Sequence, residues 1–507
     1  MDEIRVRFPP SPTGPMHIGT ARTMLVNFLF ARQHGGKIVF RSEDTDRARS
    51  TREFEKEILD GISWLGLDFD EGPFRQSERD AVYEKYFEQL KKSGAIYPCF
   101  CSAAELEAER ETQNSQKLPP RYSGKCRDLS AEEIARFETE GRKPVWRFRV
   151  PASEIKFDDL VRGEISERGE NIADFVIRKS DGQFLYHFTV VVDDAEMKIS
   201  HVIRGEDHIS NTSKHILLFE ALGAKVPRFG HLPLLLNKDR SKMSKRDESG
   251  KPATVERLKN DGYLSEAVVN FLALLGWNPG GGSEQEFFSL DELIAKFDFA
   301  GVAKAGAVFD LERLNFFNAH YLRKLPIEEL VEKVKPFLSI QAQSNIENVV
   351  APQLTHQISG GLTKGDGGEL TPEDEATLKK AVRLASERMQ FLAEAPQFLH
   401  YFFGEIDPPL ELFDNPKMKV DRASSIEALE KSLPVLEKIE NWTAEEIQKE
   451  LLALVVKLGW KNGQLLWPLR AALTGEKFSP GVWEMADALG RSASLARIRK
   501  MLDKLKK

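Results

Sequence analysis

The segment Gly14–Thr20 (GPMHIGT) has glycines and a histidine at a spacing that suits a nucleotide phosphate. Gly14 and Gly19 match the P-loop pattern G-x-x-x-x-G-K-S/T, but Thr20 stands where that pattern has its lysine, and His17 lies inside the loop. A helix follows this segment in the predicted order, and the free N–H groups of a helix N-terminus favour an anion. Two alternatives stay open: a phosphate-binding device other than a P-loop, or a proline-rich turn that leads into a buried helix.

A second segment with cationic side chains, Asn237–Gly250 (NKDRSKMSKRDESG), follows a predicted buried strand. Lys242, Lys245 and Arg246 could form a loop that closes over a triphosphate, because positive groups near a reacting phosphorus stabilise the charge of the transition state. A solvated surface loop is the alternative, since most runs of charged residues are solvated.

The elements that must position the first segment follow a βαβ order. Residues 4–8 (IRVRF) predict a short strand that two prolines end. Residues 19–34 predict a helix that is apolar on more than one face and that Gly35-Gly36 ends, and residues 37–41 predict the next strand. This order predicts a parallel sheet, and open parallel sheets bind ligands at the carboxyl ends of their strands.

The remainder of the chain predicts an interrupted sheet followed by helices. After about Ile96, a polar stretch and short strand-like runs indicate an inserted α+β module. Residues 184–194 (FLYHFTVVVDD) have the character of a buried strand and, with the strands HVIRG and HLPLLLN, predict the second half of the same sheet. Helical patterns dominate from Val255. Residues 359–373 are Gly-rich and polar, which predicts a surface linker that ends where Thr371 caps a helix.

Length, charge and cysteine content limit the classes of protein. A chain of 507 residues predicts roughly three or four domains. The sequence has neither an apolar run long enough to span a bilayer nor an N-terminal signal pattern, so we expect no membrane contact. Three cysteines predict a reducing compartment, with the cytoplasm as the expected location. The net charge of −7 argues against a simple nucleic-acid coat, although residues 491–507 are basic and could contact phosphates or form a solvated helix.

Two motifs and the residues around them resemble a known family. The HIGT of residues 17–20 and the KMSKR of residues 242–246 resemble the HIGH and KMSKS signatures of class I aminoacyl-tRNA synthetases. With RFPPSPTGPMHIGTAR, RSEDTDR, QSER, VVDD, HVIRGED and PLRAALTG, the chain resembles bacterial-type glutamyl-tRNA synthetases over essentially its whole length. Thr20 and Arg246 depart from the general signatures, but both variants are usual in the glutamyl branch.

The resemblance implies an enzyme that joins L-glutamate to the 3′ end of tRNA(Glu) in two ATP-dependent steps, through glutamyl-adenylate. The residues implied for glutamate are Arg7, Ser11, Glu43, Tyr186 and Arg204. The two arginines would bind the carboxylates, Glu43 and Ser11 the ammonium, and Tyr186 would line the pocket. The alternatives are a strand-face charge for Arg7 and a helix cap or salt bridge for Glu43.

ATP with Mg²⁺ is the second substrate that the resemblance implies. The residues implied for ATP are His17, Gly19, Thr20, Asp207, Lys242, Lys245 and Arg246. His17, Lys242 and Lys245 are the catalytic candidates. They would stabilise charge and position groups, so that no side-chain nucleophile is needed. In this family tRNA must bind before the adenylate forms productively.

The predicted inserted module contains all three cysteines. Cys99 and Cys101, with Tyr122 and Cys126 further along, resemble a zinc site found in some members of the family. Three thiolates hold zinc well, and Tyr122 or Asp128 is the candidate for the fourth ligand of a structural Zn²⁺. Three buried free cysteines are the alternative.

Roughly the last third of the chain predicts helices, which separates this family from synthetases whose anticodon domains are β-barrels. The resemblance implies tRNA anticodon contacts for Arg388, Arg470, Ser479 and Val482. Arginine suits this task because its guanidinium contacts a base edge or stacks on it. The alternative for Arg470 is a helix-surface residue braced by Trp467. The rival interpretations of the whole chain are a glutaminyl-tRNA synthetase, a P-loop NTPase and a non-catalytic tRNA-binding relative.

The expected fold class is α/β, with a Rossmann-type parallel sheet of the class I synthetases, an inserted α+β acceptor-binding module and an all-α C-terminal anticodon-binding region. The expected domains are the first half of the catalytic domain at 1–96, the acceptor-stem module at 97–185, the second half of the catalytic domain with the KMSKR loop at 186–250, a stem-contact helical domain at 251–325 and the anticodon domain at 326–507. A monomer is expected.

Overall fold

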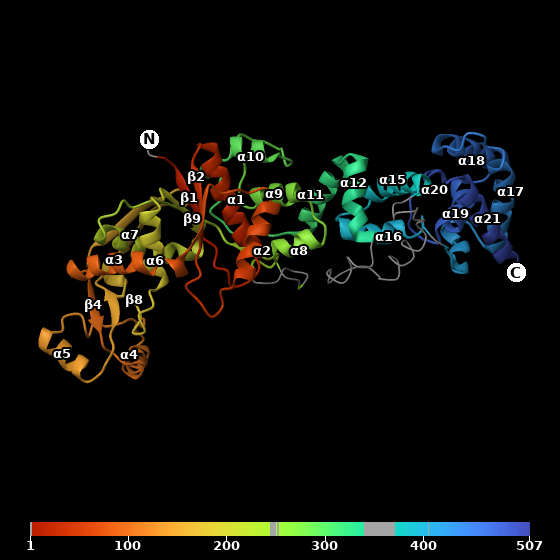
Figure 1. Cartoon of the computed structure of the whole chain (residues 1–507). Helices are drawn as coiled ribbons and strands as arrows, with labels where there is room; N and C mark the ends of the chain where they lie inside the picture. The colour runs from red at the N-terminus through yellow and green to blue at the C-terminus, as the bar shows by residue number, and fades with distance from the viewer. Residues whose placement is uncertain (1–2, 244–249, 251–252, 339–370, 404) are drawn as a thin grey trace. The chain divides into compact units, whose positions relative to one another are not determined.

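The computed structural model describes residues 3–243, 250, 253–338, 371–403 and 405–507. The chain divides into two compact units, one formed by residues 1–257 and 265–311 and the other by residues 258–264 and 312–507. Every strand of the described residues belongs to the first unit, and the second unit is helical (Figure 1).

The first sheet follows the predicted βαβ order. Its elements are β1 (Arg5–Phe8), α1 (Ile18–Gln33), β2 (Lys37–Ser42), α2 (Arg52–Trp64) and β3 (Glu71–Arg75). β2 pairs in parallel with β1 on one side and with β3 on the other. Residues on all sides of α1 are buried, which confirms the expected helix that is apolar on more than one face. The chain leaves α1 at Gly35, whose φ of 63° is the left-handed conformation that glycine adopts without strain.

The second sheet has the strand order β7-β6-β10-β9. Its elements are β6 (Glu154–Asp159), β7 (Gly163–Arg168), β9 (His201–Gly205), η3 (Glu206–His208), α7 (Ile209–Ala221) and β10 (Arg228–Leu232). β10 pairs in parallel with β9 and with β6, and β7 forms an antiparallel hairpin with β6. The backbone N–H of Ser200 donates to the carbonyl of Arg5 at 2.9 Å, so β9 begins beside β1 (Figure 1).

The expectation of a strand at residues 184–194 is wrong, because most of this run forms the helix α6 (Tyr186–Glu196). The segment is rich in β-branched residues, and residues 188–194 are all buried, so the run shows no amphipathic helical period. Periodicity cannot separate a short apolar strand from a buried helix. Here α6 packs between α7 and α3 (Asp80–Lys92), and this tertiary burial outweighs the strand propensity of valine.

One hydrophobic core joins these helices to both sheets. It includes Val39 of β2, Phe87 of α3, Phe188 of α6, Leu217 of α7 and Phe229 of β10, all nearly inaccessible to solvent. The side chains of this core pack against the sheets, whereas the cavity described below lies at the carboxyl ends of the strands.

The inserted module has a three-stranded antiparallel sheet with the order β4-β5-β8. Its elements are β4 (Ile96–Cys99), α4 (Ala103–Ser115), α5 (Ala131–Thr139), β5 (Val145–Phe148) and β8 (Val176–Arg178). Each helix begins with a capping box, in which a serine accepts from the backbone three residues later and a glutamate accepts from the serine N–H. The hairpin β6–β7 lies between β5 and β8 in the chain but pairs with β10 of the second sheet.

The other elements before Leu311 are β11 (Leu235–Leu236), α8 (Val255–Asn260), α9 (Ser265–Leu274), α10 (Leu290–Lys296) and β12 (Ala307–Val308). From Leu311 onward the described elements are α11 (Leu311–Lys324), α12 (Ile327–Val334), α15 (Pro372–Ser386), α16 (Ala395–Leu399), α17 (Arg422–Leu436), α18 (Ala444–Leu458), α19 (Asn462–Thr474), α20 (Val482–Leu489) and α21 (Arg491–Lys506).

This helical C-terminal region confirms the fold class. Thr371 caps α15 as predicted, whereas most of the predicted linker, residues 359–370, lies outside the described residues. None of the helices seen in the described residues has both the length and the apolarity to span a membrane.

Candidate active site

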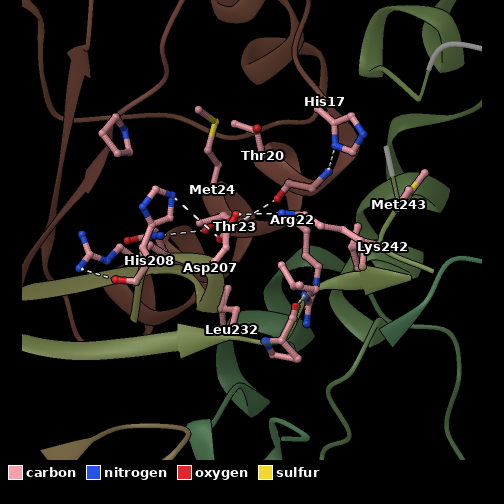
Figure 2. Close-up of a pocket in the computed structure, with 18 of the residues that line it drawn as sticks. His17, Thr20, Arg22, Thr23, Met24, Asp207, His208, Leu232, Lys242 and Met243 are labelled. Carbon is pink, nitrogen blue, oxygen red and sulfur yellow. Dashed lines mark hydrogen bonds and ion pairs between the residues drawn. The ribbon is translucent and has the colours of Figure 1, made fainter. Parts of the chain in front are cut away.

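A cavity of about 360 Å³ lies at the carboxyl ends of β1, β9 and β10 (Figure 2). This is the edge where parallel sheets bind ligands. The predicted residues that line it are Arg7, His17, Gly19, Thr20, Arg204, Asp207 and Lys242. Residues far apart in the chain, from the predicted glutamate and ATP sets alike, therefore meet in one cavity. Lys245 and Arg246 lie outside the described residues.

His17 is the N-cap of α1, and its Nδ1 accepts from the backbone N–H of Gly19 at 3.0 Å (Figure 2). Because Nδ1 is the acceptor, a neutral His17 ring has its proton on Nε2, which is then a donor. A Cβ on Gly19 would lie 3.2 Å from Nδ1 of His17, so glycine allows this close approach. The His17 ring and the first turn of α1 thus present hydrogen-bond donors of the kind that bind phosphate oxygens.

Two described stretches, the first two residues of the KMSKR motif and residues 253–255 after it, are attached near His17. In the motif, the N–H of Met243 donates to the carbonyl of Leu235 at 2.9 Å. After it, the N–H of Val255 donates to the carbonyl of Met16 at 3.0 Å. Lys242 Nζ lies 3.3 Å from Oδ2 of Asp207, so the cavity already holds one lysine beside a carboxylate.

Arg204, on β9, is a buried cation whose protein partners are neutral. Its guanidinium donates to His231 Nε2 at 3.3 Å, to His215 Nδ1 at 3.3 Å, to the Thr212 hydroxyl at 2.7 Å and to the His208 carbonyl at 3.3 Å. Burial lowers the pKa of Arg204 to about 10, which still leaves the side chain charged at neutral pH. No carboxylate within the described residues pairs directly with Arg204, so an anionic ligand would supply the missing countercharge.

Arg7, Glu43 and Tyr186 lie close to Arg204. Burial raises the pKa of Tyr186, the Glu43 carboxylate raises it further, and Arg204 and Arg7 oppose the rise. Burial also raises the pKa of Glu43, against the pull of Arg41 and Arg7. These four predicted glutamate-binding residues are thus brought together as two cations, one carboxylate and one phenol.

Ser11 is exposed in the loop after β1 and is not among the cavity-lining residues. Its neighbour Pro10 accepts from the N–H of Glu43 at 2.8 Å, so the Ser11 backbone lies near Glu43.

A buried ionic network beneath this site was not predicted from the sequence. Arg41 Nη1 lies 2.6 Å from Asp194 Oδ1, and Arg41 Nη2 lies 3.0 Å from Glu43 Oε1. Asp194 Oδ1 also lies 3.4 Å from Arg7 Nε. Asp193 accepts from Arg79 at 2.7 Å. The available signal was the presence of charged residues inside the otherwise apolar runs at β2 and α6.

The three cysteines of the inserted module cluster, with their sulfur atoms within 4.8 Å of one another. Cys101 and Cys126 are 3.5 Å apart, and the Tyr122 hydroxyl lies 3.5 Å from Cys99 Sγ. Asp128 instead pairs with Arg149 at 2.9 Å, and its side chain is 85% exposed. The donor set of three sulfurs and a phenol fits a zinc ion. Tyr122 is the better candidate for the fourth ligand, because its hydroxyl contacts Cys99 whereas Asp128 is paired with Arg149.

The anticodon candidates belong to the second unit. The Arg470 guanidinium lies 4.6 Å from the centre of the Trp467 ring and donates to the Lys477 carbonyl at 2.9 Å. Burial lowers the pKa of Arg470, and the charge of Arg388 lowers it further, so the two arginines are neighbours. Ser479 is half-buried, whereas Val482 begins α20 with its side chain 4% exposed.

Comparison with known proteins identifies this arrangement. The family described as tRNA synthetases class I (E and Q), catalytic domain, matches residues 3–316, and the family described as anticodon binding domain matches residues 329–502. The chain therefore has the catalytic domain and the anticodon-binding domain of a class I tRNA synthetase.

Curated relatives narrow the family. A glutamate–tRNA ligase of Heliobacterium modesticaldum is 43% identical over 99% of this chain and 97% of its own length. A glutamate–tRNA ligase of Bacillus subtilis is 40% identical over 98% of this chain and 99% of its own length. A crystal structure of a glutamate tRNA ligase from Elizabethkingia meningosepticum, in complex with its amino acid, is 30% identical, with a TM-score of 0.81 over 99% of this chain and 100% of that one. The chain belongs to the glutamate–tRNA ligase family of class I tRNA synthetases.

Proposed function

We propose that this chain is a glutamate–tRNA ligase that uses ATP to attach L-glutamate to the 3′ end of tRNA(Glu). In the first step the glutamate α-carboxylate attacks the α-phosphorus of ATP, which forms glutamyl-adenylate and releases pyrophosphate. In the second step the terminal ribose hydroxyl of the tRNA attacks the acyl carbon, which forms the ester and releases AMP. The observation that supports this function best is the buried, charged Arg204 with neutral partners, in the same cavity as the donors of His17 and α1.

The charges of the site complement those of glutamate. Arg204 and Arg7 bind the two carboxylates, because a guanidinium donates to a carboxylate through charge-assisted hydrogen bonds. Glu43 binds the ammonium, with the Ser11 loop beside it. Tyr186 completes the pocket between these charges; it lines a second cavity and hydrogen-bonds to His208 Nδ1 at 3.5 Å.

The other end of the cavity receives ATP. His17, Gly19 and Thr20 contact the triphosphate from the N-terminal turn of α1, and Asp207 contacts the nucleotide from η3. Lys242 comes from the opposite side, and the sequence adds Lys245 and Arg246 on the same segment. The Asp207 carboxylate is an oxygen ligand of the type that Mg²⁺ accepts, so the site suits a metal-bound triphosphate; the metal neutralises phosphate charge. The protein side chains mainly position groups and stabilise charge.

We infer a structural role for Zn²⁺ in the inserted module. Cys99, Cys101 and Cys126 supply three sulfur ligands and Tyr122 the fourth. The support is the short spacing of the sulfur atoms and the Tyr122 hydroxyl beside Cys99. The ion would connect β4 to the loop before α5 and so stabilise a module with a small core.

The tRNA is assigned to three regions. The module at 97–185 contacts the acceptor stem, the helices at 251–325 contact the stem, and the helices at 326–507 bind the anticodon through Arg388, Arg470 and Ser479, with Val482 as a packing contact beneath them. The catalytic halves at 1–96 and 186–250 hold the acceptor end. The monomeric state and the cytoplasmic location stay predictions of the sequence.

Aminoacylation of purified tRNAs tests this function. The enzyme is expected to charge tRNA(Glu) with radiolabelled glutamate and to leave glutamine unused, because glutamine lacks the second negative charge that the two arginines require. ATP–pyrophosphate exchange is expected only when tRNA is present. Charging with glutamine in place of glutamate would assign the chain to the glutaminyl class, and absence of any charging would contradict the proposal.

A further inference from the structure

Three strands bring an acid, a histidine and an arginine into one row. Arg204 lies on β9 and is directly paired with His231 on β10. Asp159 ends β6, which pairs with the other side of β10. His231 Nδ1 lies 2.6 Å from Asp159 Oδ2, and Arg204 Nε lies 3.3 Å from His231 Nε2. The row runs from the β6–β7 hairpin to the cavity that Arg204 lines.

The hydrogen-bond donors in this row can be assigned. Hydrogen bonds from His231 and from two backbone N–H groups keep the pKa of Asp159 below its usual value despite burial, so Asp159 is a carboxylate and only accepts. His231 Nδ1 therefore bears the hydrogen of that bond. Burial lowers the pKa of His231, so the ring is neutral and Nε2 offers a lone pair. That lone pair accepts from Arg204 Nε at 3.3 Å, and the hydroxyl of Thr212, which itself accepts from Arg204, lies 3.0 Å from the same nitrogen.

From this geometry we infer that Asp159 and His231 are positioning residues for glutamate recognition, because they hold the Arg204 guanidinium in the orientation that binds a carboxylate. Neither residue touches the substrate in this proposal. Both act through Arg204, and the inference rests on the proposed function because it takes glutamate as the ligand of Arg204. Preorganised groups of this kind set how well a charged substrate binds.

The surroundings of Asp159 make one substitution unusually informative. Its Oδ1 accepts from three backbone N–H groups, those of Val161 at 3.0 Å, Arg162 at 2.9 Å and His231 at 3.2 Å. In Asp159→Asn, these donors require the amide oxygen at Oδ1, which places the amide NH₂ opposite His231 Nδ1. His231 must then accept at Nδ1 and bear its hydrogen on Nε2. That hydrogen points at the N–H of Arg204, so two donors face each other and the Arg204 contact is lost.

The test measures KM for glutamate and KM for ATP in tRNA-dependent exchange. Loss of a hydrogen bond to a charged group is expected to raise KM for glutamate about tenfold or more in Asp159→Asn, with KM for ATP within about twofold. His231→Asn and His231→Gln form a matched pair. Gln keeps an acceptor near the Nε2 position and is expected to raise KM for glutamate less than Asn, which keeps only the group near Nδ1.

A double variant and a distant control separate positioning from folding. In a His231→Gln background, Asp159→Asn is expected to cause little further rise in KM for glutamate. Glutamine has no imidazole ring, so the substitution at Asp159 cannot change a tautomer there. Asp174→Asn is the control, because Asp174 is also buried but accepts from Tyr97 at 2.6 Å in the inserted module instead of from His231. It is expected to leave KM for glutamate unchanged. Thermal unfolding verifies that each variant is folded. If Asp159→Asn does not fold, the comparison of His231→Asn with His231→Gln tests the inference by itself.

Each outcome supports or overturns the inference. A rise in KM for glutamate alone, larger in His231→Asn than in His231→Gln, supports it. Equal rises in both KM values, an unchanged KM for glutamate, or full additivity of the double variant would overturn it. The unaltered enzyme is assayed in parallel: if it fails to charge tRNA(Glu), the proposed function is wrong, whereas normal charging with unaffected variants refutes only the role of Asp159 and His231.

Discussion

Removal of the Arg41 side-chain charge is expected to destabilise the protein strongly. Its side chain is 0% exposed, and three carboxylates surround it: Asp194 at 2.6 Å, Glu43 at 3.0 Å and Asp193 at 3.8 Å. Burial by itself lowers the pKa of Arg41, but the three carboxylates outweigh burial and raise it. The positive charge of the guanidinium therefore offsets the free-energy cost of burying these three carboxylates.

Arg41→Met removes that charge but keeps an unbranched side chain as far as about the Nε position. Asp194 would keep only the longer contact with Arg7 at 3.4 Å, and Glu43 would lose its nearest cation. Breaking a buried ion pair by removing one partner costs about 3–5 kcal/mol. Since 1.4 kcal/mol is a tenfold change in an equilibrium constant, the local opening of β2 and α6 should become about 10² to 4 × 10³ times more frequent.

Hydrogen exchange monitored by mass spectrometry measures this opening in the two elements directly. The matched control is Arg79→Met, because Arg79 is 18% exposed and contacts Asp193 at 2.7 Å. Asp193 would keep its hydrogen bonds from Gln76 and Tyr83, both at 2.8 Å, so the control should cost much less. A change below about 1 kcal/mol in Arg41→Met, or one equal to the control, would refute the reasoning.

Four further predictions concern the other parts of the site. Burial raises the folded-state pKa of Glu43, so the stability linked to its protonated form is present at low pH and is lost as the pH rises through that pKa. The thermal stability of the unaltered protein should therefore fall relative to that of Glu43→Gln as the pH rises above about 4, and a difference independent of pH would contradict this. Cys126→Ser should lower the zinc content from one ion per chain in metal analysis, and equal zinc in both proteins would exclude the cysteine site. Arg470→Met should raise KM for tRNA with KM for glutamate unchanged, since Arg470 belongs to the second unit; an unchanged KM for tRNA would remove it from the interface. Lys242→Ala should lower kcat of exchange by about 10² while the protein stays folded, and a normal kcat would show that Lys242 does not stabilise the transition state.

The sequence predicted the start of the catalytic sheet more reliably than its middle. Residues 4–41 carry local signals that agree with one another: a short strand, a helix ended by Gly35 and a second strand, and the structure confirms all three. The run at 184–194 has strong β propensity but forms α6, because its environment is buried on all sides. Local propensity decides a segment only where tertiary burial does not oppose it.

The candidate site was predictable for a related reason. His17, Lys242 and Arg204 were found because they lie in motifs or beside them, where residue type and spacing indicate the chemistry. Arg41, Asp193 and Asp194 were missed, although they touch or support the predicted residues, because a buried ion pair has no characteristic spacing in the chain.

The sequence by itself determined the class of chemistry and the family, and it predicted seven of the residues that line the cavity. It did so because side-chain chemistry and short-range spacing are properties of contiguous segments. Only the tertiary structure decided which groups support those residues. Asp159 reaches His231 across 72 residues, and it does so because β6 pairs with β10 instead of joining the sheet of β4, β5 and β8. Strand order of this kind depends on which hydrophobic faces can be buried together, and that is a property of the whole fold.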